Sequence, residues 1–139
     1  MSAPFLGGCA CGAIRYSAEG EPIFSMNCHC RDCQRETGSA YTAVLAVRRA
    51  TFMVIQGKPK YFELTADSGH TTTRAFCANC GSPLFGLPGI SPDMVTIRVG
   101  SLDDPSTFRP TQDIYVSSAQ PWDYMNPALP KSSKLPGNG

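Results

Sequence analysis

The seven cysteines of this 139-residue chain constrain its fold more than any other feature. They fall into three groups: Cys9-Ala-Cys11, Cys28-His-Cys30-Arg-Asp-Cys33 and Cys77-Ala-Asn-Cys80. An odd number of cysteines cannot pair completely within one chain, and a reducing compartment disfavours structural disulfides. Cysteines separated by one or two residues can bind a single ion, because one short turn aims two sulfur atoms at the same point. The spacing therefore predicts metal ligands.

The strongest of the three motifs is Cys77-Ala-Asn-Cys80-Gly81. A glycine after the second cysteine allows a positive φ and a close approach of backbone N–H groups to a thiolate sulfur. The alternative is a pair of buried free thiols in a β-turn. A metal is favoured because single cysteines bury well but rarely cluster at three places in one chain.

Seven thiols divide naturally into four and three. A structural zinc site is closed by four protein ligands, whereas a catalytic zinc site has three and keeps one position open. Spacing alone does not decide whether Cys77 and Cys80 join the pair Cys9 and Cys11 or the pair Cys30 and Cys33. Either division leaves three cysteines over.

The rest of the chain reads as short strands separated by turns. Runs of three to seven β-branched or aromatic residues occur at 14–16, 41–47, 51–55, 61–64, 84–87, 94–99 and 114–116. The 13 glycines and 12 prolines suit a chain with many turns. This pattern predicts an all-β fold, either a sandwich or a folded sheet. One short helical turn is expected over Arg31–Thr37, ending at Gly38.

Length and charge set further limits. We expect one β domain over residues 1–125 and an extended Pro/Gly-rich tail over residues 126–139. The formal charge of +1 provides no basic field for nucleic acid. No apolar run approaches the ~20 residues that cross a bilayer, so we expect no membrane partner. Residues 1–8 do not resemble a secretory signal, and a cytoplasmic protein is expected.

The cysteine motifs, taken together, resemble a known family. The segments Gly8-Cys9-Ala-Cys11-Gly12, Cys28-His-Cys30-Arg-Asp-Cys33 with Gly38-Ser39, Cys77-Ala-Asn-Cys80-Gly81-Ser82 and Pro121-Trp122 occur here in that order. Their order and spacing are similar to those of the glutathione-dependent formaldehyde-activating enzymes, also called the GFA or CENP-V family. The similarity extends from about Phe5 to Trp122.

The resemblance implies an Mss4-like fold of folded antiparallel sheets with two zinc ions per chain. It implies a structural zinc held by Cys9, Cys11, Cys77 and Cys80. It also implies a catalytic zinc held by Cys28, Cys30 and Cys33. Fold and zinc sites transfer well within such a family, whereas the substrate does not.

The open zinc site would allow thiol chemistry. A metal lowers the pKa of a bound thiol, which makes a nucleophile available at neutral pH. Attack of glutathione, or another thiol, on formaldehyde or a related aldehyde would give an S-hydroxymethyl adduct. The reverse reaction cleaves a carbon–sulfur bond, so we expect a carbon–sulfur lyase. The small-molecule partners are therefore a thiol and an aldehyde.

Supporting residues are suggested by their positions. His29 lies between two zinc ligands and would shuttle a proton or complete the zinc shell, although a hydrogen-bonded or exposed imidazole is the favoured alternative. Glutathione carboxylates would accept bidentate contacts from nearby cations: Arg31, Arg35, Arg48 and Arg49. Trp122 either anchors the C-terminal tail or forms a wall of the active site.

Other functions compete with the enzyme. One alternative is a zinc-bearing binding module, which would need only the four-cysteine site. The presence of Cys28, Cys30 and Cys33 favours an enzyme over such a module. The same three cysteines without zinc would form a redox switch. Nucleic-acid binding through a zinc knuckle lacks both a basic face and interleaved aromatic residues.

Overall fold

The computed structural model describes residues 4–66 and 68–136, and strands dominate them. The strands are β1 (Phe5–Gly8), β2 (Arg15–Ala18), β3 (Phe24–Cys28), β4 (Thr42–Arg48), β5 (Phe52–Gln56), β6 (Lys60–Thr65), β7 (Thr71–Phe76), β8 (Pro83–Pro88), β9 (Met94–Arg98) and β10 (Gln112–Ile114). One α-helix, α1 (Arg31–Thr37), and four short 3₁₀ turns complete the described elements. None of the helices in these two ranges is long and apolar enough to cross a membrane.

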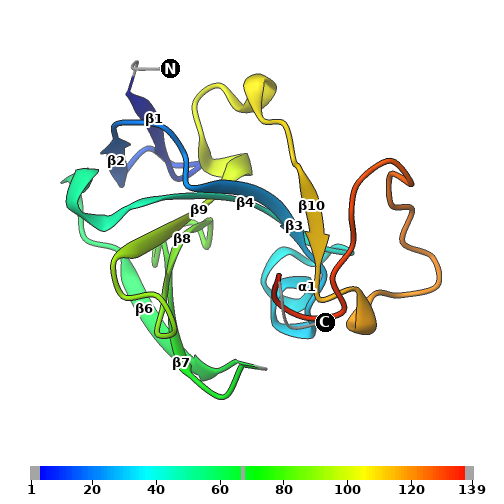
Figure 1. Cartoon of the computed structure of the whole chain (residues 1–139). Helices are drawn as coiled ribbons and strands as arrows, with labels where there is room; N and C mark the ends of the chain where they lie inside the picture. Colours follow the sequence, from blue (N-terminus) through cyan, green and yellow to red (C-terminus); the bar gives the residue numbers. More distant parts are fainter. Residues whose placement is uncertain (1–3, 67, 137–139) are drawn as a thin grey trace.

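The strands form two sheets. The small sheet has the order β1-β2-β5, and the large sheet has the order β10-β3-β4-β9-β8-β7-β6. All paired strands are antiparallel except β10, which runs parallel to β3. Figure 1 shows the large sheet extending from β10, beside the C-terminal segment and α1, to β6 and β7 at the other end. The predicted all-β fold is confirmed.

The strand prediction was incomplete at three places and wrong at one. The pattern did not identify β1, β3 or β7, because each mixes apolar residues with Gly, Ser, Asn or Thr. The run at 114–116 does not form a strand, since β10 ends at Ile114. The chain turns there because Tyr115 adopts the left-handed conformation, with a φ of 58°.

The predicted helical turn is confirmed at both ends. Cys30 precedes the helix as its N-cap, and its sulfur accepts a hydrogen bond from the backbone N–H of Cys33 at 3.3 Å. At the other end Gly38 has a φ of 69° and donates its N–H to the carbonyl of Gln34. Glycine takes this conformation without steric cost, so the helix ends here.

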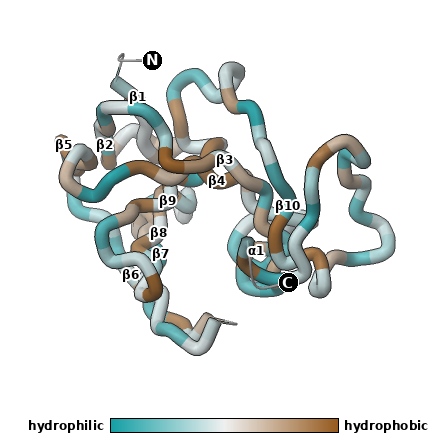
Figure 2. Tube along the Cα trace, viewed as in Figure 1, coloured by the Kyte–Doolittle hydropathy of each residue, from teal (hydrophilic) through white to brown (hydrophobic). Residues whose placement is uncertain are grey.

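Two groups of buried side chains hold the sheets together. The larger one includes Tyr16 of the small sheet and Leu84, Phe85, Val95 and Ile97 of the large sheet. The smaller core cluster lies at the β3–β10 end and contains two of the cysteines: Met26, Cys28, Cys33, Val44, Ile114 and Tyr115. Figure 2 shows the hydrophobic stretches of β3, β4 and β9 gathered at the centre of the molecule. The second cluster thus joins the core directly to a cysteine motif.

The C-terminal segment packs against β10. Asp113 accepts a hydrogen bond from the N–H of Ser132 and donates its own N–H to the carbonyl of Pro130, both at 3.0 Å. Tyr115 donates its N–H to the carbonyl of Lys134 at the same distance. Residues 130–134 of the predicted tail therefore follow the edge of the large sheet. The domain boundary at 125/126 stays a prediction, and residues 137–139 of that tail lie outside the described residues.

The packing of β9 gives a first prediction. Ile97 is fully buried and pairs with Leu45 of β4 and Phe85 of β8. Replacing Ile97 by Ala should lower the free energy of unfolding by about 2–5 kcal/mol, because the surrounding sheet cannot close the cavity. Urea unfolding of the metal-loaded protein measures this loss. Ile55→Ala is the control, since Ile55 is 53% exposed on β5 and should change stability by about 0.5 kcal/mol or less. Equal losses would contradict this placement of the core.

Candidate metal centres and active site

Four cysteines converge from two distant parts of the chain. Cys9 and Cys11 lie in the turn between β1 and β2 of the small sheet, and Cys77 and Cys80 lie in the turn between β7 and β8 of the large sheet. The four sulfur atoms all lie within 4.8 Å of one another. The two turns also touch directly, because the N–H of Ala10 donates to the hydroxyl of Ser82 at 3.0 Å.

The geometry of this four-cysteine cluster fits a metal ion. A tetrahedron of Zn–S bonds of about 2.3 Å has sulfur–sulfur edges of about 3.8 Å. The Sγ atoms of Cys9 and Cys11 are 3.6 Å apart, and those of Cys11 and Cys77 are 3.8 Å apart. The Cys9 sulfur accepts the N–H of Ile14 at 3.2 Å, as thiolate ligands commonly do. The cluster can therefore hold a metal.

Local backbone geometry forms the second turn as expected. Gly81 has a φ of 80° and donates its N–H to the carbonyl of Cys77 at 2.7 Å. Hydrogen bonds from the Ser82 hydroxyl and the backbone N–H of Ser82 lower the pKa of Cys80 to about 5. The turn thus favours the thiolate form that metal binding requires.

The remaining three cysteines form a second cluster at the end of β3. Cys28 is the last residue of that strand, Cys30 caps α1, and Cys33 lies in the first turn of the helix. Their sulfur atoms also lie within 4.8 Å of one another. Hydrogen bonds from Cys28 and Cys30, with the nearby charges of Arg98 and Arg74, hold the pKa of Cys33 well below its usual range. This three-cysteine cluster can hold a second metal and leave one coordination position free.

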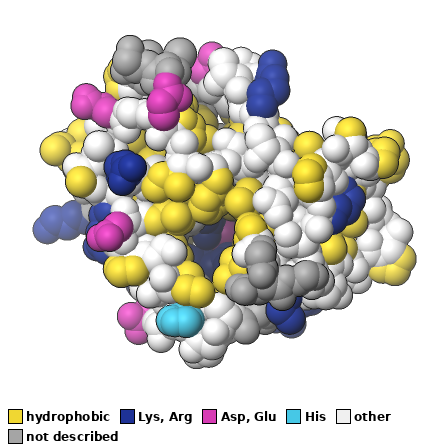
Figure 3. Space-filling model, in the orientation of Figure 1, with side chains coloured by type: hydrophobic (Ala, Val, Ile, Leu, Met, Phe, Trp, Pro, Cys, Tyr) yellow, Lys and Arg dark blue, Asp and Glu magenta, His cyan; other side chains and the backbone are white. Residues whose placement is uncertain are grey.

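The three-cysteine cluster lies in the wall of a cavity of about 530 Å³. The cavity is bounded by β3, β4, β7, β9, β10 and the C-terminal segment. Its walls are largely apolar and include Phe24, Met26, Val44, Ile90, Met94 and Leu135. Figure 3 shows a hollow rimmed by hydrophobic side chains, with Lys/Arg side chains at its floor. The structure therefore places three thiols in a pocket of the size that binds small molecules.

Two buried arginines stand beside these thiols. Arg74 of β7 donates from Nη2 to the sulfur of Cys33 at 3.7 Å and from Nη1 to Glu36 Oε1 at 3.0 Å. Arg98 of β9 donates from Nε to the same carboxylate oxygen at 2.9 Å. The side chains of Arg74, Arg98 and Glu36 are less than 10% exposed. Burial opposes the charge of Arg74, but the negative charges of Cys33 and Glu36 raise the pKa of its guanidinium.

The sheet makes room for Arg98 at Gly86 of β8, which pairs with Arg74 on one side and Thr96 on the other. A Cβ at Gly86 would lie 2.8 Å from Oγ1 of Thr96 and 3.0 Å from Nη2 of Arg98. A side chain at this position would therefore displace the Arg98 guanidinium. The glycine allows that guanidinium to lie across the strand.

Residues 4–118 match the family model of the glutathione-dependent formaldehyde-activating enzymes, which is more than half of the chain. The chain belongs to this family. Family membership implies an enzyme-like role in glutathione and formaldehyde chemistry, and the two cysteine clusters agree with the predicted metal-binding motifs.

Solved structures agree with the fold of this GFA-family protein. One similar chain is a Rhodobacter sphaeroides protein whose crystal structure was determined in a structural genomics programme. The two share 16% sequence identity with a TM-score of 0.58, over 91% of this chain and 98% of the other. At this identity the likeness concerns the fold alone. No curated protein matched the sequence.

The structure does not bring the predicted substrate-binding arginines to the cavity of this GFA-family protein. None of the four, Arg31, Arg35, Arg48 and Arg49, lines it, and all four are exposed. The prediction placed them near the site because they are close to the cysteines in sequence. The cavity-lining arginines are instead Arg74 and Arg98, from strands far along the chain. The sequence offered one indication of Arg74, because it is the lone arginine within the Thr-rich run 71–76. That run was not predicted to be a strand.

His29 is buried away from the cavity. Its Nε2 lies 2.8 Å from Asp113 Oδ1 and its Nδ1 lies 2.6 Å from Asp123 Oδ2, so both ring nitrogens have carboxylate partners. Lys131 donates to the other oxygen of Asp113 at 2.9 Å. This arrangement agrees with the hydrogen-bonded imidazole that was the favoured alternative. It ties the cysteine loop to β10 and to the segment after it.

Asp123, rather than its neighbour Trp122, makes a buried contact, which is with His29. Trp122 is 69% exposed and does not line the cavity, whereas Asp123 is the residue that pairs with His29. Tyr115, which the sequence did not single out, does line the cavity. Its left-handed backbone is unusual for a bulky residue, and such conformations concentrate at functional sites.

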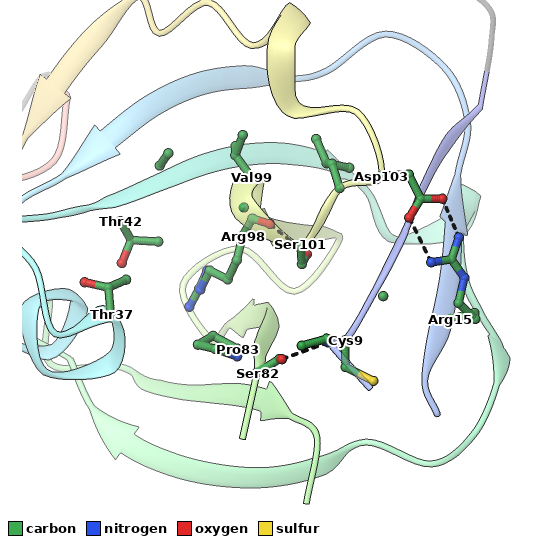
Figure 4. A pocket seen from close by; sticks show the side chains of 15 residues that line it. Cys9, Arg15, Thr37, Thr42, Ser82, Pro83, Arg98, Val99, Ser101 and Asp103 are labelled. Atoms are coloured by element: carbon green, nitrogen blue, oxygen red, sulfur yellow. Dashed lines mark hydrogen bonds and ion pairs between the residues drawn. The ribbon is translucent and has the colours of Figure 1, made fainter. Parts of the chain in front are cut away.

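Arg98 also borders a second cavity of about 580 Å³, shown in Figure 4. Its lining mixes apolar and polar residues and includes Thr37, Thr42 and the ion pair between Arg15 and Asp103. None of the three clustered cysteines Cys28, Cys30 and Cys33 lines it. The first cavity is therefore the candidate active site.

The different positions of the two clusters predict different effects of cysteine removal. Cys77→Ala should lower the free energy of unfolding by more than about 4 kcal/mol, because it removes one ligand from a cluster that can bind a metal between the two sheets. Cys30→Ala should cost about 1–2 kcal/mol, because its cluster lies at one end of one sheet. Urea unfolding of both variants with zinc present measures the difference. Equal destabilisation would overturn this division of structural and functional roles.

The Asp113 contacts predict a pH-dependent contribution to stability. Burial raises the pKa of Asp113, but hydrogen bonds from His29 and Lys131 outweigh it and hold that pKa below the usual range. The unfolded carboxyl therefore binds its proton at higher pH than the folded one. The stabilisation is fully present above about pH 4 and is lost as the pH falls through the folded-state pKa.

Asp113→Asn isolates the contribution of the Asp113 carboxylate. Any loss of bound metal in acid affects wild type and variant alike, so the difference between their stabilities reports on the carboxylate. The wild type should be more stable than the variant at pH 6, and the difference should shrink steadily below pH 4. Urea unfolding at a series of pH values measures the two free energies. A difference that does not change with pH would show that the ionised carboxylate contributes nothing.

Proposed function

We propose that this protein is a zinc-dependent enzyme of the carbon–sulfur lyase type. It joins glutathione or another thiol to formaldehyde or a related aldehyde, and it cleaves the S-hydroxymethyl adduct in the reverse direction. The observation that carries the proposal is the meeting of Cys28, Cys30 and Cys33 in the wall of a cavity of about 530 Å³. Membership of the GFA family supports the same chemistry.

The proposed complement is two Zn²⁺ ions per chain. Cys9, Cys11, Cys77 and Cys80 would hold the structural ion, and Cys28, Cys30 and Cys33 would hold the catalytic one. All-sulfur ligand sets of three and four suit zinc. A Zn²⁺ ion held by Cys28, Cys30 and Cys33 would lower the pKa of a thiol bound to it and so would supply a sulfur nucleophile at neutral pH.

The protein's own side chains support this chemistry by charge and position. Three thiolates around a divalent ion leave a negative charge, and Arg74 offsets it from 3.7 Å away at Cys33. Glu36 fixes the guanidinium groups of Arg74 and Arg98 in place. The largely apolar walls limit water around the reacting atoms, so the two reactants meet in a fixed orientation.

The reaction balances without any further reactant. The thiol sulfur forms a bond to the aldehyde carbon, and the electron pair of the C=O π bond moves to oxygen. The proton that leaves the thiol ends on that oxygen. We assign no proton transfer to His29, because both of its nitrogens already face carboxylates; its proposed role is to position the cysteine loop. The proposed location is the cytoplasm, where free thiols persist.

A non-catalytic binding module of the same fold is the second candidate. Such a module would use the four-cysteine cluster for folding and the cavity for holding a ligand or partner. The convergence of three further thiols on that cavity favours the enzyme. A redox switch at these three cysteines would contain a disulfide in place of the metal.

Metal analysis and exchange spectroscopy test the proposal together. Freshly purified protein should contain about two zinc ions, and Cys30→Ala should contain about one. With ¹³C-labelled formaldehyde and glutathione, the wild type should accelerate exchange between free aldehyde and adduct in two-dimensional NMR, whereas Cys30→Ala should not. Arg49→Met is the control and should behave as the wild type. A folded protein with no zinc would exclude the metal mechanism, and two zinc ions without acceleration of any thiol would favour the binding module.

A further inference from the structure

The cavity at the three-cysteine cluster is far larger than its smallest expected reactant requires. Formaldehyde has two non-hydrogen atoms, whereas a cavity of about 530 Å³ falls in the range that binds whole drug-sized ligands. Most of the space must therefore receive another part of the substrate. The chemistry of the cavity wall identifies what kind of group that is.

The wall is predominantly apolar away from the thiols. Phe24, Met26 and Val44 contribute from β3 and β4. Ile90 and Met94 contribute from the β8–β9 turn and β9. Figure 3 shows hydrophobic side chains gathered around the hollow on this face of the molecule. Methionine side chains are flexible and adapt to different apolar shapes.

The positive charges of the two arginines that line the cavity are already paired with negative groups. Arg98 and Arg74 share Glu36, and Arg74 also faces the sulfur of Cys33. The Nε of Arg74 has no hydrogen-bond partner among the described residues and is closed off from solvent. Asp32, which also lines the cavity, adds a negative charge.

Charge counting then disfavours an anionic body. Zn²⁺ with three thiolates carries −1, and a bound substrate thiolate makes −2. The two arginines and Glu36 together supply +1, and Asp32 removes it again. A carboxylate inside the cavity would be repelled in a low-dielectric setting. The exposed arginines near the cysteines lie elsewhere, so they offer no contact to one.

We infer that the physiological thiol substrate of this chain carries an apolar, uncharged body, such as an aryl or branched alkyl group. This inference rests on the proposed thiol–aldehyde chemistry and specifies its substrate class. The body lies against Met26, Val44 and Met94, with the reacting sulfur at the three cysteines. Glutathione, which carries two carboxylates and an ammonium group, fits this apolar wall poorly.

The C-terminal segment completes the apolar wall. Leu135 packs against the core cluster that contains Cys28 and Cys33, and it lines the cavity. The hydrogen bonds of Asp113 and Tyr115 to residues 130–134 fix the chain just before it. A segment that the sequence predicts as a loose tail thus contributes to substrate recognition.

A matched set of thiols tests the inference on protein in which cobalt(II) replaces zinc, because cobalt absorption bands report directly on a thiolate that joins the metal. The probes are 2-phenylethanethiol, its para-carboxylate derivative, glutathione and 2-mercaptoethanol. We expect 2-phenylethanethiol to bind about tenfold or more tightly than glutathione, since burial of its ring removes apolar area from water. Adding the para-carboxylate should reverse most of that gain.

Two methionine variants locate the effect. Met94→Gln places an amide in the cavity wall and should weaken 2-phenylethanethiol about fivefold, while leaving the affinity for 2-mercaptoethanol unchanged. Met53→Gln is the matched control, since Met53 is 62% exposed on β5 and does not line the cavity. It should leave both affinities unchanged. Circular dichroism and metal content confirm that each variant is folded and loaded.

The outcomes separate this inference from the proposed function. If no thiol alters the cobalt bands, the thiolate mechanism fails, and the inference fails with it. If thiols bind but glutathione or the para-carboxylate probe binds as tightly as 2-phenylethanethiol, the proposed chemistry stands and the apolar substrate is wrong. Equal effects of Met94→Gln and Met53→Gln would place the ring outside this cavity.

Discussion

The meeting of four thiols across two sheets is the constraint on which the rest of the structure depends. Cys11 and Cys77 lie 66 positions apart in sequence, yet their sulfur atoms are 3.8 Å apart. Other contacts support this junction. Tyr16 and Phe52 of the small sheet pack against Phe85 of the large one, and Arg15 pairs with Asp103 in the segment after β9. A metal at this junction would convert two marginal hairpins into one folded unit, since binding free energy becomes folding free energy.

The sequence predicted those parts of the molecule that depend on local pattern. The mainly β architecture, the helix at 31–37 and the positive φ of Gly81 follow from residue type and spacing, and all three are confirmed. The division of the cysteines did not follow from spacing, because two pairings were equally compatible with it. Only the resemblance to a family selected the grouping that the sulfur positions now agree with.

The arginines beside the thiols could not be found in this way. Arg74 and Arg98 are distant in sequence from the cysteines and reach them through the register of β7, β8 and β9. Sequence proximity instead pointed to arginines on the helix and at the end of β4, which face solvent. Register is a long-range property, and one residue of slip would turn Arg74 to the opposite face. Predicting this part of the site therefore requires the strand pairing and not the composition of a segment.

The three-cysteine cluster also belongs to the hydrophobic core, and this fact limits how the site can change. Cys28 and Cys33 pack with Met26, Ile114 and Tyr115, so the same side chains hold the sheet end together and shape the cavity. His29, between the ligands, uses both ring nitrogens to tie this loop to Asp113 and Asp123. In the proposed function, a thiol cluster packed into the core would keep the reacting atoms fixed, and the methionine and C-terminal walls would adapt to the substrate body. Substrate preference can therefore diverge within such a fold through the wall residues alone, while the cysteines remain in place.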